Sequence, residues 1–262
     1  MAVGVLAIGM IFIGGVFPVA IYFTTIATER TIAAAATDEA FAKIRLYAIG
    51  DPANILDDVK VGILKEYELT DFNDSLIRPF PATANIEPNE FTYPSTAANI
   101  KDKQYCWSAL CRLTETYDPA INPNPPVQVT VFVCRKIGGS MKYYARDPVS
   151  GEVDWLREVD GPVPVKVKVN QAGLKNNELR ITNLNPNEWT FINDGYTIVD
   201  DKTGRLYRVL ERYPSQPDTI LLDRYWDNSP PGGSPDMVWV VPPPVNGGRG
   251  PCIAVYQKVI KF

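Results

Sequence analysis

The sequence predicts an α+β protein in which a long N-terminal hydrophobic helix, kinked or unwound near Gly14–Pro18, packs on an antiparallel β-sheet head. Three observations predict this class. Residues 2–27 carry no charged side chain. The apolar pattern then continues at helical spacing as far as Ile49. From Tyr105 onwards, apolar and polar residues alternate instead, which is typical of strands.

The first fifty residues have the composition of one long helix. The charge-free run exceeds the roughly 20 apolar residues that cross a bilayer, and Gly50 and Pro52 end the pattern. A helix of this length would measure roughly 70 Å, which far exceeds the thickness of a bilayer. Its second half must therefore bury its apolar stripe in protein. After the run, apolar residues fall on one helical face (Ile26, Ala33, Phe41, Ile44 and Ala48) and charged residues nearer the other (Arg30, Asp38 and Arg45).

An interruption is expected inside the apolar run. Gly14 and Gly15 are weak helix formers, and Pro18 lacks an N–H group. Proline costs about 3 kcal/mol in a helix interior and glycine about 1 kcal/mol. The helix is therefore expected to kink or unwind between about Ile13 and Val19. One interpretation is a tolerated kink in an ordinary membrane anchor, because glycine and proline are common in such helices. The alternative is a spring-like segment in a helix that packs against copies of itself.

The rest of the chain reads as strands separated by turns rich in proline, glycine and aspartate. Tyr105–Thr114 and Val127–Lys136 alternate strongly and are expected to be half-buried strands. Val163–Val169 alternates valine with lysine, which indicates an edge strand protected by Lys166 and Lys168. The other expected strands are Met141–Ala145, Val153–Leu156, Tyr196–Val199, Arg205–Leu210, Thr219–Leu222, Met237–Val241 and Cys252–Ile260, with hairpin turns at Asp147–Gly151 and Asp200–Gly204.

All 4 cysteines follow the helical region, and an even number in a translocated domain is consistent with two disulfides. On one strand, Cys106 and Cys111 would lie about 17 Å apart on opposite faces, too far to be bridged. Antiparallel pairing of the first two strands could place Cys106 opposite Cys134 and leave Cys111 for Cys252. Free buried thiols are the alternative.

Composition argues against catalysis and against nucleic-acid binding. The chain has no histidine, so Ser-His-Asp and Cys-His arrangements are excluded, and neither a metal site nor a cofactor is expected. The net charge of −4 and the lack of clustered Lys and Arg argue against a nucleic-acid partner. The sequence therefore favours a protein that is not an enzyme.

The succession from Val3 to Tyr22, followed by a threonine- and alanine-rich amphipathic helix, resembles bacterial type IV pilins and pseudopilins, closest to the PilV-like minor-pilin branch. The resemblance covers the first fifty residues. In that family a processed end of the Phe-Thr-Leu-x-Glu type precedes the apolar run, whereas here Met1 opens inside the run. We expect that the sequence starts within a longer gene product; assembly without that glutamate is the alternative.

The resemblance implies a structural subunit of an extracellular type IV pilus-like filament. Residues 1–50 would anchor the chain in the inner membrane before assembly and form the filament core afterwards, and residues 51–262 would form an extracellular β-rich head. Its partners would be copies of itself and the pilus or type II secretion assembly machinery. The alternatives are a minor pilin or pseudopilin that primes or tips a filament, and a single-pass anchored periplasmic binding module that does not polymerise. The expected assembly residues are Val5, Ile8, Phe12, Gly14, Gly15, Phe17, Pro18, Ile21, Tyr22 and Ile26.

Overall fold

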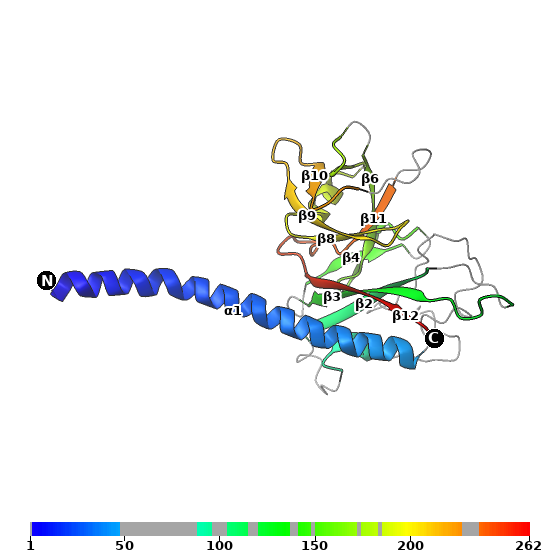
Figure 1. Cartoon of the computed structure of the whole chain (residues 1–262). Helices are drawn as coiled ribbons and strands as arrows, with labels where there is room; N and C mark the ends of the chain where they lie inside the picture. The colour runs from blue at the N-terminus through cyan, green and yellow to red at the C-terminus, as the bar shows by residue number, and fades with distance from the viewer. Residues whose placement is uncertain are drawn as a thin grey trace.

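The computed structural model describes residues 2–47, 88–95, 104–114, 120–136, 141–147, 150–171, 174–182, 185–226 and 236–262. These residues form three layers: one long helix, a four-stranded antiparallel sheet and a closed six-stranded barrel (Figure 1). The helix is α1 (Ala2–Leu46). Its N-terminal half projects away from the other layers, and its C-terminal half lies along the sheet (Figure 1).

The strands of the described residues fall into three sheets. The four-stranded sheet has the order β1 (Thr92–Tyr93), β2 (Tyr105–Leu113), β3 (Val127–Arg135) and β12 (Cys252–Ile260). The barrel closes in the order β10 (Thr219–Leu222), β7 (Glu178–Ile181), β6 (Val165–Asn170), β11 (Asp236–Val240), β8 (Thr197–Asp200) and β9 (Leu206–Arg212). A separate hairpin pairs β4 (Tyr143–Arg146) with β5 (Val153–Val159), and two short 3-10 helices are η3 (Pro88–Phe91) and η5 (Pro186–Phe191).

The expected fold class, an α+β protein whose helix packs on an antiparallel β-sheet head, is wrong. The described chain is predominantly β and contains a closed barrel beside the antiparallel sheets. The expectation failed because Val163–Val169 was interpreted as an edge strand. In the structure, β6 is hydrogen-bonded to β7 on one side and to β11 on the other, and a closed barrel has no edge.

The lysines that suggested an edge lie on the outer wall of the barrel and have partners there. Lys166 Nζ lies 5.0 Å from the centre of the Trp239 ring and 3.6 Å from Asp201 Oδ1. Lys168 Nζ pairs with Glu152 Oε1 at 2.7 Å. Alternation of valine with lysine in this strand therefore separates a barrel interior from its outer surface.

Helix α1 is continuous from Ala2 to Leu46, so the expected unwinding near Gly14–Pro18 is wrong. Pro18 removes one hydrogen bond, to the carbonyl of Gly14, while the bonds on either side of it keep the helix intact. The expected membrane span is not found either: within the described part of the chain, no helix combines the length and hydropathy of a membrane-crossing segment.

The C-terminal half of α1 packs on the sheet through small residues followed by larger ones. Ala33, Ala36 and Ala40 are completely buried, and side chains of this size let the helix axis approach the sheet closely. Phe41 and Ile44 extend the same stripe toward the end of the helix. Ala33, Phe41 and Ile44 thus confirm part of the apolar face expected from the sequence, whereas Ile26 is only half-buried and Ala48 lies outside the described residues. The stripe contacts a row of fully buried valines on β3: Val127, Val129, Val131 and Val133.

The sheet is covered on both faces, whereas the sequence had indicated half-buried strands. On β2, Trp107 and Ala109 contact the helix layer, and Cys106 and Leu110 contact the barrel. The barrel covers this second face through a small apolar core that includes Trp239. The sheet is therefore the middle layer between helix and barrel, as Figure 1 shows.

Polar side chains hold the β8–β9 turn on the barrel-facing side of the sheet. Arg112 Nη1 donates to the Lys202 carbonyl at 3.0 Å, and Gln257 Nε2 donates to the Gly204 carbonyl at 2.7 Å. Gly204 has φ = 67°, which suits glycine, and its Cβ position lies 3.1 Å from Arg112 Nε. The turn thus lies close enough to the sheet to be locked by side chains from two of its strands.

A buried carboxylate in the 3-10 helix η5 gives a first prediction. Glu188 in η5 is 6% exposed, and its Oε2 atom has no hydrogen-bond partner among the described residues. Burial, together with the negative charge of Glu152, raises the pKa of Glu188 to about 7. Because this exceeds the pKa of an unfolded glutamate, the folded state binds the proton more tightly, and the resulting stability is full below about pH 4.5 and is lost as the pH rises through 7.

We therefore expect Glu188→Gln to unfold with a weaker pH dependence than the unsubstituted chain. The free energy of unfolding of each protein is measured by urea unfolding at pH 5 and at pH 8. The difference between the two proteins should change by about 2 kcal/mol between these pH values, with the variant gaining stability relative to the unsubstituted chain at pH 8. The exposed Glu211→Gln in β9 is the matched control and should leave the pH profile unchanged. Parallel profiles for all three proteins would contradict the assignment.

Candidate functional site

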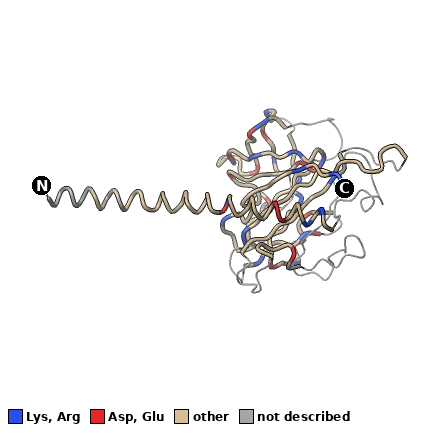
Figure 2. Tube along the Cα trace, turned by 60° about the horizontal axis from the view of Figure 1, so that its bottom comes forward, with Lys and Arg blue, Asp and Glu red and all other residues tan. Residues whose placement is uncertain are grey.

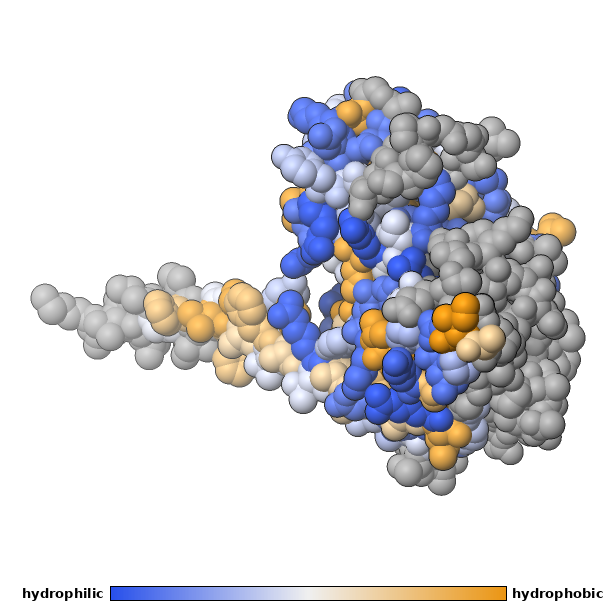
Figure 3. All heavy atoms as spheres, turned by 45° about the vertical axis from the view of Figure 1, so that its right-hand side comes forward, coloured by the Kyte–Doolittle hydropathy of each residue, from blue (hydrophilic) through white to orange (hydrophobic). Residues whose placement is uncertain are grey.

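The projecting part of α1 exposes an apolar surface that has no partner among the residues that the structure describes. We call residues 9–28 the stalk. Every described side chain of the stalk is exposed except Ile26, which is half-buried. No charged residue lies on the stalk, and charges begin where α1 reaches the head (Figure 2). In Figure 3 hydrophobic side chains dominate the visible stalk, whereas hydrophilic residues cover much of the visible head.

The apolar side chains surround the stalk and do not form a single stripe. Phe12, Phe17 and Tyr22 are 71%, 64% and 60% exposed. Each follows the last by five residues, so the three side chains point about 140° apart around a helix of 3.6 residues per turn. A helix that is apolar all round is a buried helix. The stalk therefore needs partners on several sides. The other large exposed side chains are Met10, Val16, Val19, Ile21 and Phe23.

The threonines near the base of the stalk do not make it polar. The Oγ1 atoms of Thr24 and Thr25 donate to the carbonyls of Ala20 and Ile21, four residues earlier, at 2.8 and 2.9 Å. Thr28 makes the equivalent bond to Thr24 at 2.8 Å. With these hydroxyl groups bonded to the helix backbone, the segment can be buried without leaving a donor unpaired.

A buried glutamate fixes α1 where it leaves the head. The side chain of Glu29 is 7% exposed and lies between two arginines. Its Oε1 atom accepts from Arg135 Nη1 at 2.9 Å, and its Oε2 atom accepts from Arg249 Nη2 at 3.3 Å. Arg135 ends β3 and Arg249 belongs to the loop before β12, so the two contacts tie the helix to the middle layer from different segments.

The loop that carries Arg249 is itself held against the barrel. A Cβ atom at Gly250 would lie 2.0 Å from Tyr196 Oη, so only glycine leaves room for this tyrosine. Tyr196 hydrogen-bonds to the backbone of Gly250 and to the side chain of Asn193, while burial raises the pKa of its hydroxyl group. Contacts thus run from the barrel through Gly250 and Arg249 to Glu29.

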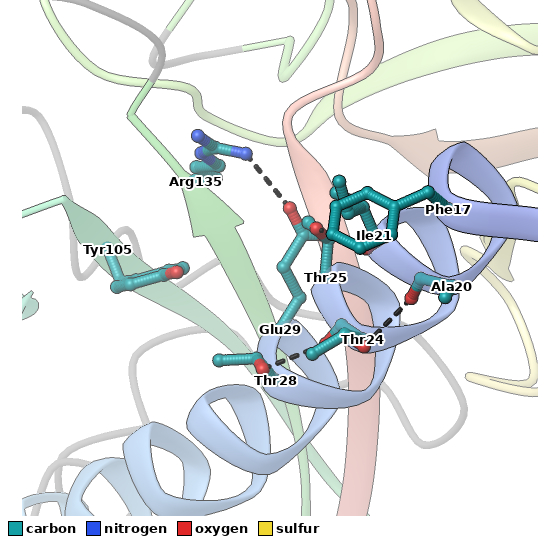
Figure 4. A pocket seen from close by; sticks show the side chains of 9 residues that line it. All are labelled: Phe17, Ala20, Ile21, Thr24, Thr25, Thr28, Glu29, Tyr105 and Arg135. Atoms are coloured by element: carbon teal, nitrogen blue, oxygen red, sulfur yellow. Dashed lines mark hydrogen bonds and ion pairs between the residues drawn. The ribbon is translucent and has the colours of Figure 1, made fainter. Parts of the chain in front are cut away.

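A groove of about 400 Å³ lies between the stalk and the head. Figure 4 shows Phe17 and Ile21 of the stalk on one side, Tyr105 across from them, and the pair of Glu29 and Arg135 between. We call this the stalk-base groove. It continues the apolar surface of the stalk onto the head and places one ion pair within it. Its lining residues are Phe17, Ala20, Ile21, Thr24, Thr25, Thr28, Glu29, Tyr105 and Arg135.

The four candidate cysteines are free thiols in the structure. Cys106 lies opposite Cys134 in the strand register, the arrangement expected from the sequence. Cys111 belongs to the core that contacts α1, whereas Cys252 packs in the core between sheet and barrel. Because these two cysteines face opposite sides of the sheet, a disulfide between them, as the sequence had suggested, cannot form.

The structure describes the side chains of most of the expected assembly residues on the exposed stalk. Those of Val5 and Ile8 lie outside the described side chains. Gly14 and Gly15 have open space around them, and Phe17 and Ile21 line the stalk-base groove. Sequence reasoning missed the contacts of Glu29 with Arg135 and Arg249; the lone carboxylate directly after a charge-free run was the signal that could have pointed to it.

Comparison with known proteins yields no family: no family model, no curated protein and no solved structure matches the chain.

Proposed function

We propose that the chain is a structural subunit of an extracellular, type IV pilus-like filament, and that it assembles through its stalk. The observation that carries the proposal is the continuous helix with exposed apolar side chains on all sides. The resemblance of Val3–Tyr22 to type IV pilins and pseudopilins supports the same function. An assembly machinery of the type IV pilus or type II secretion class would be its partner.

The distribution of the apolar side chains favours several copies over one partner. A dimer would cover one side of the stalk and leave the side chains that point about 140° away in water. In a bundle of stalks, each helix is covered by neighbours on all sides. Burying the seven large methionine, aliphatic and phenylalanine side chains of the stalk, each half or more exposed, contributes roughly 8 kcal/mol per subunit before the entropic cost of association.

The base of the stalk favours a filament in which the heads keep a fixed orientation. The contacts of Glu29 with Arg135 and Arg249 set the direction in which the stalk leaves the head. The stalk-base groove continues the stalk's apolar surface, so a neighbouring stalk that covers Phe17 and Ile21 can also insert side chains beside the head. Identical subunits with a fixed stalk direction build a regular helical array.

Assembly after detergent removal tests the proposal. The full chain, purified in mild detergent, is dialysed and followed by sedimentation and negative-stain electron microscopy. We expect filaments of uniform width whose formation depends on protein concentration. A chain that stays monomeric in buffer contradicts the proposal and favours a binding module that does not polymerise. Amorphous aggregates without a repeat also contradict it.

A further inference from the structure

Three of the four cysteines form a row across adjacent strands. Cys134 on β3 is in register with Cys106 on β2 and with Cys252 on β12, so it has a cysteine neighbour on each side. All three side chains lie in the core between the sheet and the barrel. The Cys106 thiol donates to the Cys134 carbonyl at 3.8 Å, and the Cys252 thiol donates to the Ala254 carbonyl at 3.7 Å.

The backbone ladder distinguishes the two neighbours of Cys134. Antiparallel strands alternate hydrogen-bonded pairs with non-hydrogen-bonded pairs, and side chains lie closer in the latter. Arg135 N donates to the Pro251 carbonyl at 2.8 Å, so the next pair along, Cys134 with Cys252, is non-hydrogen-bonded. Lys136 N donates to the Gln104 carbonyl at 2.7 Å. The pair two residues further, Cys134 with Cys106, is therefore hydrogen-bonded, with its side chains further apart.

We propose that the row is an oxidation site that forms one disulfide, between Cys134 and Cys252, and leaves Cys106 as a thiol. The oxidant is a disulfide, either a small molecule or a thiol–disulfide oxidoreductase. The Cys252 thiolate attacks the oxidant's S–S bond, forms a mixed disulfide and releases one thiol. The Cys134 thiolate then attacks Cys252 sulfur and releases the second thiol, so two protein thiols are oxidised while one external disulfide is reduced to two thiols.

The burial of the three thiols fixes this order of events. Cys252 is the only one of them that is partly exposed, so it meets an external oxidant first. Cys106 and Cys134 are 2% and 1% exposed. Burial raises the pKa of Cys106 to about 12 and, together with the neighbouring Cys252 thiol, raises the pKa of Cys134 well above its usual value. Neither therefore reacts with an external reagent before Cys252 does.

The disulfide would join the last strand to the centre of the middle layer. Cys252 follows Arg249 by three residues, and Arg249 contacts Glu29 at the base of the stalk. A covalent bond at Cys252 therefore fixes one end of the loop that carries Arg249. This proposal stands on the strand register and does not depend on filament assembly.

Peptide mapping tests the proposal directly. The full chain in mild detergent is equilibrated with a glutathione redox buffer, free thiols are alkylated under denaturing conditions, and non-reduced peptides are analysed by mass spectrometry. We expect a cross-linked pair containing Cys134 and Cys252, with Cys106 and Cys111 alkylated. The melting temperature of the oxidised chain should exceed that of the reduced chain by roughly 10 °C, as expected for a disulfide that closes a long loop.

Two variants make the result decisive. Cys111→Ser is the matched control, since Cys111 lies on the opposite face of the sheet, and it should retain the cross-link. Cys252→Ser should abolish both the cross-link and the difference in melting temperature between redox states. A principal cross-link between Cys106 and Cys134, or four alkylated cysteines in the unsubstituted chain under oxidising conditions, overturns the proposal.

Discussion

Ile21→Asp is expected to abolish filament assembly while leaving the head folded. Ile21 is 55% exposed in the free chain and lines the stalk-base groove, so assembly would bury it. The bundle would then enclose a carboxylate without a partner. An unpaired buried charge costs at least about 3 kcal/mol, which corresponds to a loss of more than about 100-fold in the association constant per subunit. Sedimentation after detergent removal, with circular dichroism of the soluble fraction, measures both effects.

The control for Ile21→Asp is the same kind of change on the head. Leu156 in β5 is 96% exposed and lies outside the stalk and its groove, so Leu156→Asp should assemble like the unsubstituted chain. Ile21→Leu keeps an apolar side chain of similar volume and should also assemble. If Ile21→Asp formed filaments at the same concentration as Leu156→Asp, the stalk would not be the assembly surface.

Ile44→Ala is expected to destabilise the packing of the helix on the sheet strongly. Ile44 is completely buried in the core between α1 and the sheet. Removing its side chain loses apolar burial and leaves a cavity, which together cost about 3 kcal/mol. For a domain of this size, the melting temperature should fall by roughly 9 °C. Calorimetry of the unassembled chain in detergent measures the shift.

Leu46→Ala provides the comparison for Ile44→Ala. Leu46 belongs to the last turn of the same helix but is 76% exposed, so its replacement should change the stability by less than about 0.5 kcal/mol. Equal melting temperatures for the two variants would show that the C-terminal half of α1 is not a structural part of the head, and that the stalk has no rigid base.

Local patterns were sufficient to find most of the strands. Tyr105–Thr114 and Val127–Lys136 were predicted to within one residue of β2 and β3, because alternation is a property of the strand itself. The hairpin turns ending at Gly151 and Gly204 are confirmed, with φ of 76° and 67°. Glycine at these positions is a local signal that needs no knowledge of the rest of the fold.

Pairing between distant strands was not predictable in the same way. Closure of the barrel depends on the pairing of β6 with β11, about seventy residues later in the chain. The sequence of either strand alone does not indicate which strand it pairs with. The short strand β7 and the helix η5 were missed, since four to six residues carry little periodicity. The burial of the second face of the four-stranded sheet was not predicted either, because the barrel that covers this face was not predicted.

The candidate site was likewise predictable only where it depends on local sequence. The stalk was evident from the sequence, because an uninterrupted apolar run needs no partner to be recognised. Its base was not, because Glu29 meets Arg135 and Arg249 across separations of 106 and 220 residues. The cysteine row required both the strand register and the hydrogen-bonding phase of the ladder, of which the sequence suggested only the pairing of Cys106 with Cys134.

Electron cryomicroscopy of the particles that form after detergent removal tests the central claim most directly. The account predicts a helical filament in which the stalks of several copies contact one another along the axis, with Phe12, Phe17 and Tyr22 covered by neighbouring stalks and the heads outside. A reconstruction in which copies meet only through their heads, with each stalk separate from every other stalk, would contradict it.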